Sequence, residues 1–203
     1  MHAVATEHPC AYVKFHRGLR ALHTELAPLP PARDLQLRPW QRILTQFLQQ
    51  PADDRSIIWV VDRPGQAGKS TLSKHLVLTK GATVLEGRLA DMCYSYDKQP
   101  IVIFDISRAA AEHSDHLYSM AEKLKNGIFL STKYDSMMKV FDPPHVIFFS
   151  NSAPDTSKWS SDRCKIVDLD KAEPFPVDML LQAGSQQQQI QPVLPDNLGS
   201  PFL

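Results

Sequence analysis

The sequence predicts an α/β fold whose central sheet is parallel and covered by helices on both faces. Three short apolar runs, at residues 57–61, 101–104 and 145–149, indicate its strands. They lack a polar residue at every second position, as is typical of strands buried on both faces of a sheet. The second run ends in Asp105, and the third is followed by Ser150 and Asn151. Polar side chains at the carboxyl ends of such strands face the crevice where α/β proteins bind ligands.

Three helices are expected around these strands. Pro39 favours a first helical turn, and apolar residues recur after it at helical spacing through residue 48. A second helix is expected at 70–78, behind a glycine-rich turn. A third is expected to begin at Ser114, a good N-cap, and to run to residue 124 with an apolar face. The first helix could support contacts between subunits or pack on its own core.

The composition indicates one globular domain with tails, since 43% of the 203 residues are hydrophobic. We expect a helical linker or oligomerisation segment at 1–51, an α/β core at 52–170 and a polar, disordered tail at 171–203. Disorder is expected above all beyond residue 184, where four glutamines precede three prolines and one glycine.

Charge and cysteine content narrow the classes of function. The 22 basic and 22 acidic residues balance, so any nucleic-acid contact is expected in a local patch and not on a large basic face. The balance argues against a sequence-specific duplex binder, but not against a translocase. Three scattered cysteines without metal-ligand spacing suggest reduced thiols in an intracellular protein. No run is long enough for a membrane span, which favours the cytoplasm or nucleus.

A glycine-rich turn with Lys69 and Ser70 follows the first predicted strand and opens a helix. This layout predicts a nucleoside-triphosphate site, because backbone N–H groups can surround phosphates while Lys69 reaches the β- or γ-phosphate and Ser70 reaches Mg²⁺. Gly65 and Gly68 can take positive φ angles there. The predicted phosphate-binding residues are Gly65, Gly68, Lys69, Ser70 and Thr71. The alternative is a chance Gly-Lys-Ser tripeptide on a surface turn.

Two strand ends offer partners for this turn. Asp105 is a natural Mg²⁺ ligand of the Walker B type, although it could instead cap the next turn. Asn151 can bind the attacking water or the γ-phosphate by hydrogen bonds without the repulsion that a carboxylate would add. A turn-forming asparagine is the alternative reading of Asn151.

Residues 124–135 read as a turn leading into a strand, and they predict a hairpin that projects Lys125, Lys133 and Tyr134. Ammonium groups pair with phosphates and a ring stacks on a base, so this set suits single-stranded nucleic acid. A solvated hairpin would carry much the same residues.

The ordered set of motifs from about residue 37 to residue 169 resembles the superfamily 3 helicase domain of replication-associated (Rep) proteins of circular single-stranded DNA viruses. The segments that carry the resemblance are Arg38-Pro39-Trp40-Gln41, the strand and turn at 57–71, Gly87-Arg88-Leu89-Ala90-Asp91-Met92, Ile103-Phe104-Asp105-Ile106-Ser107-Arg108, Leu124-Lys125-Asn126-Gly127, Ser131-Thr132-Lys133-Tyr134-Asp135, and Phe149-Ser150-Asn151 with Pro154-Asp155. The resemblance implies a P-loop NTPase core of the AAA+-like type.

The resemblance also implies roles and partners. Lys69 and Ser70 correspond to motif A, Asp105 to motif B, Lys133 to the DNA-contacting lysine of motif B′, and Asn151 to motif C. Such domains form rings, commonly hexamers, and need an arginine finger from a neighbouring subunit. Arg163, which follows motif C, is the candidate, because a guanidinium can neutralise charge on the transferring phosphoryl group. A structural Asp162–Arg163 turn would account for the same residues.

Two departures from the family pattern concern hydrolysis. Arg63 stands where the phosphate loop usually begins with glycine, and Ile106 stands where many of these helicases have a second acid. Polarising the attacking water would then fall to Asp105, Asn151 or a carboxylate such as Glu86 or Asp91. The chain also lacks the His-x-His and Tyr-x-x-Lys patterns of the Rep endonuclease, so no nicking activity is expected from it.

The sequence therefore predicts an ATP- and Mg²⁺-dependent helicase or translocase on single-stranded DNA, acting in rolling-circle replication of a circular genome in the nucleus of a host cell. Two alternatives stay open. One is an RNA helicase or RNA-stimulated NTPase, because contacts that follow the backbone discriminate poorly between strands. The other is a decayed, domesticated remnant that binds nucleotide or nucleic acid without catalysis.

Overall fold

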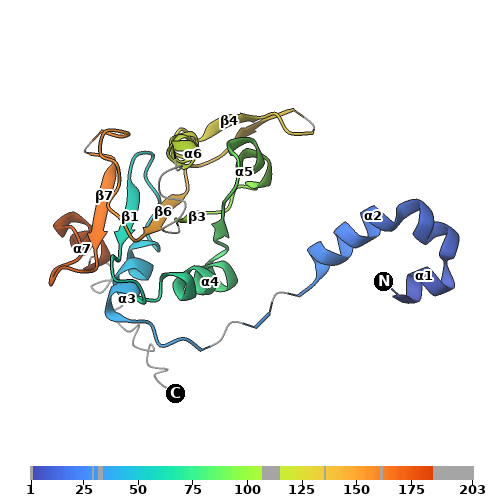
Figure 1. Ribbon diagram of the computed structural model, residues 1–203, viewed down its shortest axis with the longest axis horizontal. Coiled ribbons are helices and arrows are strands. Elements are labelled where there is room, and N and C mark those ends of the chain that lie inside the picture. Colours follow the sequence, from blue (N-terminus) through green and yellow to red (C-terminus); the bar gives the residue numbers. More distant parts are fainter. Residues whose placement is uncertain are drawn as a thin grey trace, which may run out of the picture. The chain divides into compact units, whose positions relative to one another are not determined.

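The computed structural model describes residues 2–28, 30–31, 34–106, 115–134, 136–160 and 162–184 (Figure 1). The chain forms two compact units that meet in sequence between residues 33 and 34. The first holds the helices α1 (His2–Glu7) and α2 (Pro9–Leu26), and the second holds everything that follows. The expected boundary at residue 51 lies inside the second unit. In the described residues, no helix combines the length and the apolar character needed to span a membrane.

The second unit is built on a parallel sheet, as the sequence predicts, and this sheet has five strands, three of which are the predicted ones. Its strand order is β2-β3-β6-β1-β7. The strands are β1 (Ile57–Val61), β2 (Thr83–Val84), β3 (Ile101–Asp105), β6 (His145–Ser150) and β7 (Cys164–Asp168). Every residue of β1 and β6 is buried, which explains why their sequences show no alternation of apolar and polar residues.

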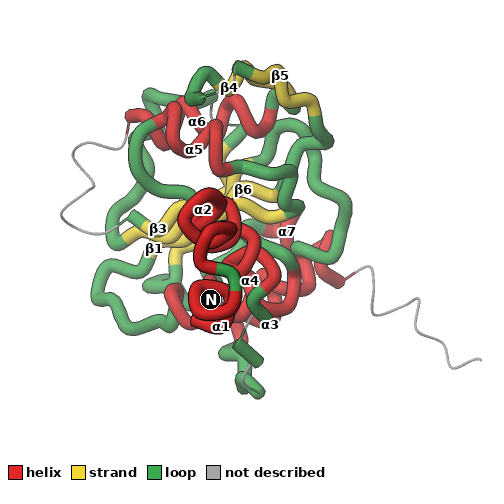
Figure 2. Tube along the Cα trace, turned by 90° about the vertical axis from the view of Figure 1, so that its right-hand side faces the viewer, coloured by secondary structure: helices red, strands yellow, loops and turns green. Residues whose placement is uncertain are grey.

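Helices cover both faces of this sheet, and each face has its own apolar cluster. One face packs against α3 (Pro39–Phe47), α4 (Lys69–Lys80) and α7 (Val177–Gly184), and the other against α5 (Leu89–Ser95) and α6 (Asp115–Lys125). Figure 2 shows α5 and α6 on one side of the strands and α3 and α4 on the other. Alternate residues of β1 enter the two clusters, with Trp59 on the α6 side and Val60 on the α3 side.

The predicted boundary of the core at residue 170 is wrong, because the chain continues to pack after it. Helix α7 contacts α3, and both Phe175 and Met179 are buried in the same apolar cluster as Leu44 and Phe47. Two apolar anchors suffice to order a segment whose composition is otherwise polar. The expected disorder beyond residue 184 lies outside the described residues.

The predicted hairpin is present as β4 (Ile128–Ser131) paired antiparallel with β5 (Met137–Val140). Phe129 points into the core beneath α5 and α6, whereas Ile128 and Leu130 on the opposite face are exposed. The turn between the strands holds Lys133 and Tyr134, while Asp135 lies outside the described residues.

The predicted role of Lys125 is wrong, because its side chain does not project from the hairpin toward a nucleic acid. Its side chain is 1% exposed, and its ammonium donates to the backbone carbonyls of Asp53 and Pro144 at 2.8 Å each. These contacts tie the end of α6 to the segment before β1 and to the approach of β6. Burial lowers the pKa of Lys125 to about 8, and attraction from Asp53 and Asp54 only partly offsets it.

This lowered pKa predicts a dependence of stability on pH. The unfolded chain keeps the Lys125 proton up to the ordinary pKa of 10.5, whereas the folded chain releases it near 8. Between these values the unfolded state binds more protons, so folding becomes more favourable as pH rises. We expect the free energy of unfolding of the wild type, relative to Lys125→Met, to increase by about 3 kcal/mol across this window.

Urea unfolding of the two proteins at several pH values measures this difference. Contributions from the titration of all other groups are common to both proteins and cancel when one free energy is subtracted from the other. Lys123→Met, at a half-buried lysine of the same helix, is the matched control for the replacement of a lysine by methionine. A wild-type to Lys125→Met difference that stays flat across the window would contradict the assignment.

Candidate nucleotide-binding site

The turn between β1 and α4 has the backbone of a phosphate-binding loop. Gly65 and Gly68 take φ angles of 88° and 86°, as predicted, and Gln66 between them takes 70°. Gly68 is also the N-cap of α4, so the helix begins at Lys69. Three left-handed residues curl the loop into a concave surface at the amino end of a helix, where partial positive charge gathers.

Asp62, which the sequence analysis does not single out, occupies the inside of this loop. Its carboxylate is buried and accepts hydrogen bonds from the N–H groups of Gly65 at 3.0 Å and Ala67 at 3.1 Å. The same carboxylate forms an ion pair with the Lys69 ammonium at 2.8 Å. The groups that the motif predicts for phosphate thus already converge on an oxyanion.

The electrostatics of Asp62 follow from these contacts. Burial alone would raise its pKa, but the hydrogen bond from Lys69 and those from the two amides outweigh burial and hold the pKa below its ordinary value. The carboxylate is therefore ionised at neutral pH. An acid between a buried strand and a glycine-rich turn was the available sequence signal for this residue.

The strand ends bring the other predicted residues to the same loop. The Ser70 hydroxyl donates to the Asp105 carboxylate at 3.2 Å, so motif A meets the end of β3. The Asn151 amide, just after β6, donates to the backbone carbonyl of Asp62 at 2.5 Å. Thr71 is exposed on the first turn of α4. The structure thus gathers Lys69, Ser70, Asp105 and Asn151 at one edge of the sheet.

The donor set at Ser70 and Asp105 fits Mg²⁺. A hydroxyl and a carboxylate are hard oxygen ligands, and a nucleotide-bound Mg²⁺ takes only one or two protein oxygens beside phosphates and waters. Both side chains are exposed and adjacent, so they can share a cation with a bound nucleotide.

The two departures from the family pattern have structural explanations. The Arg63 backbone needs no positive φ, and its guanidinium pairs at 2.8 Å with Asp168, the last residue of β7, and with Asp170 just after it. Ile106 is 3% exposed and belongs to the apolar cluster beneath α6. A second acid at that position would therefore be buried in the core.

The two alternative carboxylates lie in different places. Glu86 is exposed after β2 at the same edge of the sheet as the loop, whereas Asp91 pairs with Lys133.

The N-terminal residues of α3 hold the phosphate loop from its outer side. The Arg38 guanidinium donates to the carbonyl of Gln66 at 2.8 Å, and the Trp40 indole donates to that of Ala67 at 3.1 Å. The Gln41 amide donates to the carbonyl of Gly68 at 3.0 Å. These are the residues of the Arg-Pro-Trp-Gln segment, whose role the sequence alone left unassigned.

Lys133 and Tyr134 lie together at the hairpin turn, outside the nucleotide loop. Lys133 pairs with Asp91 of α5 and also lies 5.2 Å from the centre of the Tyr134 ring. Tyr134 is 76% exposed and meets Tyr94 of α5 edge to face, with ring centres 5.0 Å apart. The neighbouring Asp91 carboxylate raises the pKa of Lys133, which keeps its ammonium charged.

Arg163 lies at the opposite edge of the sheet from the phosphate loop. Its backbone carbonyl accepts from the N–H of Ile57, the first residue of β1, whereas the loop follows the last residue of that strand. Its side chain therefore has no place in the nucleotide site of its own chain. Among the described residues, its Nη1 atom is buried without a hydrogen-bond partner.

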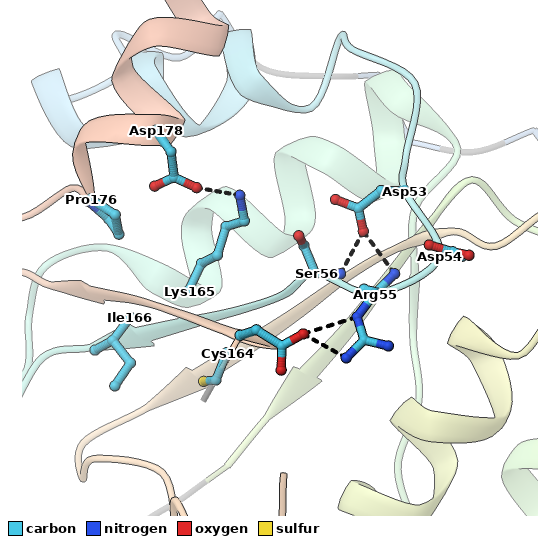
Figure 3. Close-up of a pocket in the computed structure, with 10 residues that line it drawn as sticks. Asp53, Asp54, Arg55, Ser56, Cys164, Lys165, Ile166, Pro176 and Asp178 are labelled. Atoms are coloured by element: carbon cyan, nitrogen blue, oxygen red, sulfur yellow. Dashed lines mark hydrogen bonds and ion pairs between the residues drawn. The ribbon is translucent and has the colours of Figure 1, made fainter. Parts of the chain in front are cut away.

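A cavity of about 490 Å³ lies near this same edge, between the segment before β1, the start of β7 and α7 (Figure 3). Four aspartates line it, and its two cations are engaged, since Arg55 pairs with Asp162 and Lys165 with Asp178. A triphosphate would meet more negative than positive charge there. The nucleotide site is therefore assigned to the loop at 62–71 and not to this cavity.

Comparisons with known proteins show what this part of the chain is similar to. Residues 58–152, which contain the loop at 62–71 together with Asp105 and Asn151, match the RNA helicase family model. The chain is 40% identical over 131 residues to the master replication protein of Faba bean necrotic yellows virus (isolate Syrian SV292-88), which covers 64% of this chain and 45% of that protein. It is 40% identical over 139 residues to Para-Rep C10 of Milk vetch dwarf C10 alphasatellite, covering 66% and 49%.

A third relative, the master replication protein of Subterranean clover stunt virus (strain F), is 36% identical over 159 residues, covering 77% of this chain and 54% of that protein. The chain thus spans about half the length of the curated relatives it matches. The fold, the order of the motifs and these matches agree. The domain that holds the site is similar to a helicase domain of the superfamily 3 type, as in replication-associated proteins of circular single-stranded DNA viruses.

Proposed function

We propose that this chain is an ATP-dependent translocase on single-stranded DNA that acts in the replication of a circular genome. The observation that carries the proposal is the convergence of the Lys69 ammonium and the loop amides on one oxyanion, beside Ser70, Asp105 and Asn151. Such a constellation suits the phosphates of a nucleotide and the transfer of a phosphoryl group.

In this proposal ATP enters the loop by replacing the Asp62 carboxylate as the acceptor for Lys69 and the loop amides. Ser70 and Asp105 hold the metal ion, which neutralises phosphate charge when bound. Asn151 lies where its amide can orient a water or bind the γ-phosphate without adding negative charge. With Ile106 in the core, proton acceptance from that water falls to Asp105 or to Glu86 at the same edge of the sheet.

The first test is Mg²⁺-dependent ATP hydrolysis, with Lys69→Ala as the background. We expect single-stranded DNA to stimulate the wild type, and the variant to fall roughly 100-fold, because a cation at the transferring phosphates is lost. Single-stranded RNA is the parallel arm, since the matched family model is that of RNA helicases. If RNA stimulated ATP hydrolysis more strongly than DNA, RNA and not DNA would be the substrate. Turnover of the wild type no faster than that of Lys69→Ala would indicate the non-catalytic remnant.

We assign strand contact to the hairpin turn, with Lys133 on phosphates and Tyr134 on a base. Lys133→Ala should weaken single-stranded DNA binding about 5- to 10-fold and reduce the salt slope by about one, because one phosphate contact is lost. Binding of ATP without DNA should stay unchanged. Filter binding at several salt concentrations measures both quantities.

Lys80→Ala is the matched control for Lys133→Ala, because Lys80 is exposed at the far end of α4 from the loop. It removes the same charge and should leave strand binding intact. An equal loss of ATP affinity in Lys133→Ala would place Lys133 in the fold or in the nucleotide site instead.

Arg163 is proposed as the arginine finger for the site of a neighbouring copy in a ring, because its position excludes the site of its own chain. Arg163→Ala and Lys69→Ala should each be inactive alone. Mixing them should restore part of the ATPase, since some interfaces then pair an intact loop with an intact finger. If no ratio of the two restores activity, Arg163 has a structural role only.

A further inference from the structure

The three contacts from α3 fall on consecutive carbonyl groups, those of Gln66, Ala67 and Gly68. In a trans peptide unit the C=O and the following N–H point in opposite directions across one rigid plane. The described backbone contains no cis peptide. Each donor that holds a carbonyl outward therefore aims the next N–H inward. The N–H groups aimed in this way belong to residues 67, 68 and 69.

The inner side of the loop agrees with this geometry. The Ala67 N–H, which shares a peptide unit with the Gln66 carbonyl, donates to the buried carboxylate of Asp62. The Lys69 N–H belongs to the first turn of α4, where helix N–H groups have no partner within the helix. The donors on α3 thus act on the amides that face an anion.

Gln41 is the most constrained of the three donors. It is 2% exposed, its side-chain oxygen accepts from the Arg38 N–H at 2.9 Å, and its side-chain nitrogen donates to Gly68. A Cβ atom added at Gly68 would approach that nitrogen to 3.1 Å. Trp40 is held by edge-to-face packing on Phe149 of β6, so the donors stand on an element packed against the sheet.

We propose that Arg38, Trp40 and Gln41 are positioning residues that set the loop amides for the phosphates of the nucleotide. The inference rests on the proposed nucleotide site and adds residues that the phosphate-loop motif does not contain. Without these three donors the Gln66–Ala67 unit keeps its hydrogen bond to Asp62 and the Gly68–Lys69 unit keeps that from the N–H of Leu72, but the outer contacts that hold all three units are lost. Ordering them would then oppose nucleotide binding.

Two single substitutions test whether these donors position the loop. Trp40→Phe keeps a ring against Phe149 but removes the indole N–H. Gln41→Glu keeps the acceptor for Arg38 but sets a carboxylate against the Gly68 carbonyl. Gln46→Glu, at an exposed position of the same helix, is the matched control for the added charge. Hydrogen exchange of residues 65–69 is measured in each protein without nucleotide, and binding of MgATP is measured by calorimetry.

We expect Trp40→Phe to weaken MgATP binding about fivefold, the effect of one net hydrogen bond, and Gln41→Glu to weaken it more. Exchange at 65–69 should speed up in both, while Gln46→Glu matches the wild type. If both variants bind MgATP as tightly as the wild type, with or without a lower melting temperature, the positioning role of these residues is overturned while the nucleotide site stands. If the wild type itself binds MgATP no better than Lys69→Ala, the proposed nucleotide site is contradicted, and so is the positioning role that rests on it.

Discussion

The parallel pairing of β1 with its neighbours is the constraint on which the site depends. The last residue of β1, Val61, pairs with Ser150 of β6 and with Asp168 of β7, and Phe149 of β6 pairs with Asp105 of β3. This register brings four strand ends to one edge of the sheet. Because both faces of the strands are buried, slippage by one residue would exchange the side chains of the two apolar clusters. Packing of the core thus fixes the relative positions of Lys69, Asp105 and Asn151.

The polar residues at that edge are held in place by residues outside the predicted catalytic set. Asp62 orders the loop from within, and the three donors of α3 order it from outside. The two sets meet on the peptide unit between Gln66 and Ala67, whose carbonyl accepts from Arg38 and whose N–H donates to Asp62. An oxyanion inside the loop and hydrogen bonds behind it are together consistent with a loop shaped before the nucleotide arrives, which lowers the entropic cost of binding.

The fold and the main site residues could be predicted because their signals are local. Continuous apolar runs indicate buried strands, and the glycine-rich turn with Lys69 and Ser70 indicates an anion-binding loop. Asp62 and Gln41 were not assigned, since their importance lies in contacts with backbone groups, which carry no sequence signature. Lys125 was assigned wrongly, because a lysine beside a turn is usually solvated and nothing local shows two carbonyls converging on its ammonium.

Long-range packing explains the remaining errors in the same terms. The α7 segment is short and its surroundings are polar, so only its contact with α3 reveals that Met179 is buried. β7 was not predicted as a strand. It is an edge strand whose first residues are partly exposed, which weakens its pattern. In both cases the stabilising partner lies more than a hundred residues away in sequence.

Paired charges surround both proposed contacts, with the nucleotide and with the strand, in a chain whose formal charge is zero. The cations near the two proposed contacts already face carboxylates, as Lys69 faces Asp62 and Lys133 faces Asp91, while Arg63 faces Asp168 and Asp170. A phosphate must displace the carboxylate, so its net gain is the difference between two interactions. The buried pair of Lys69 and Asp62 is shielded from salt, whereas the exposed pair at Lys133 is screened. Salt should therefore act mainly on strand contact and much less on the nucleotide.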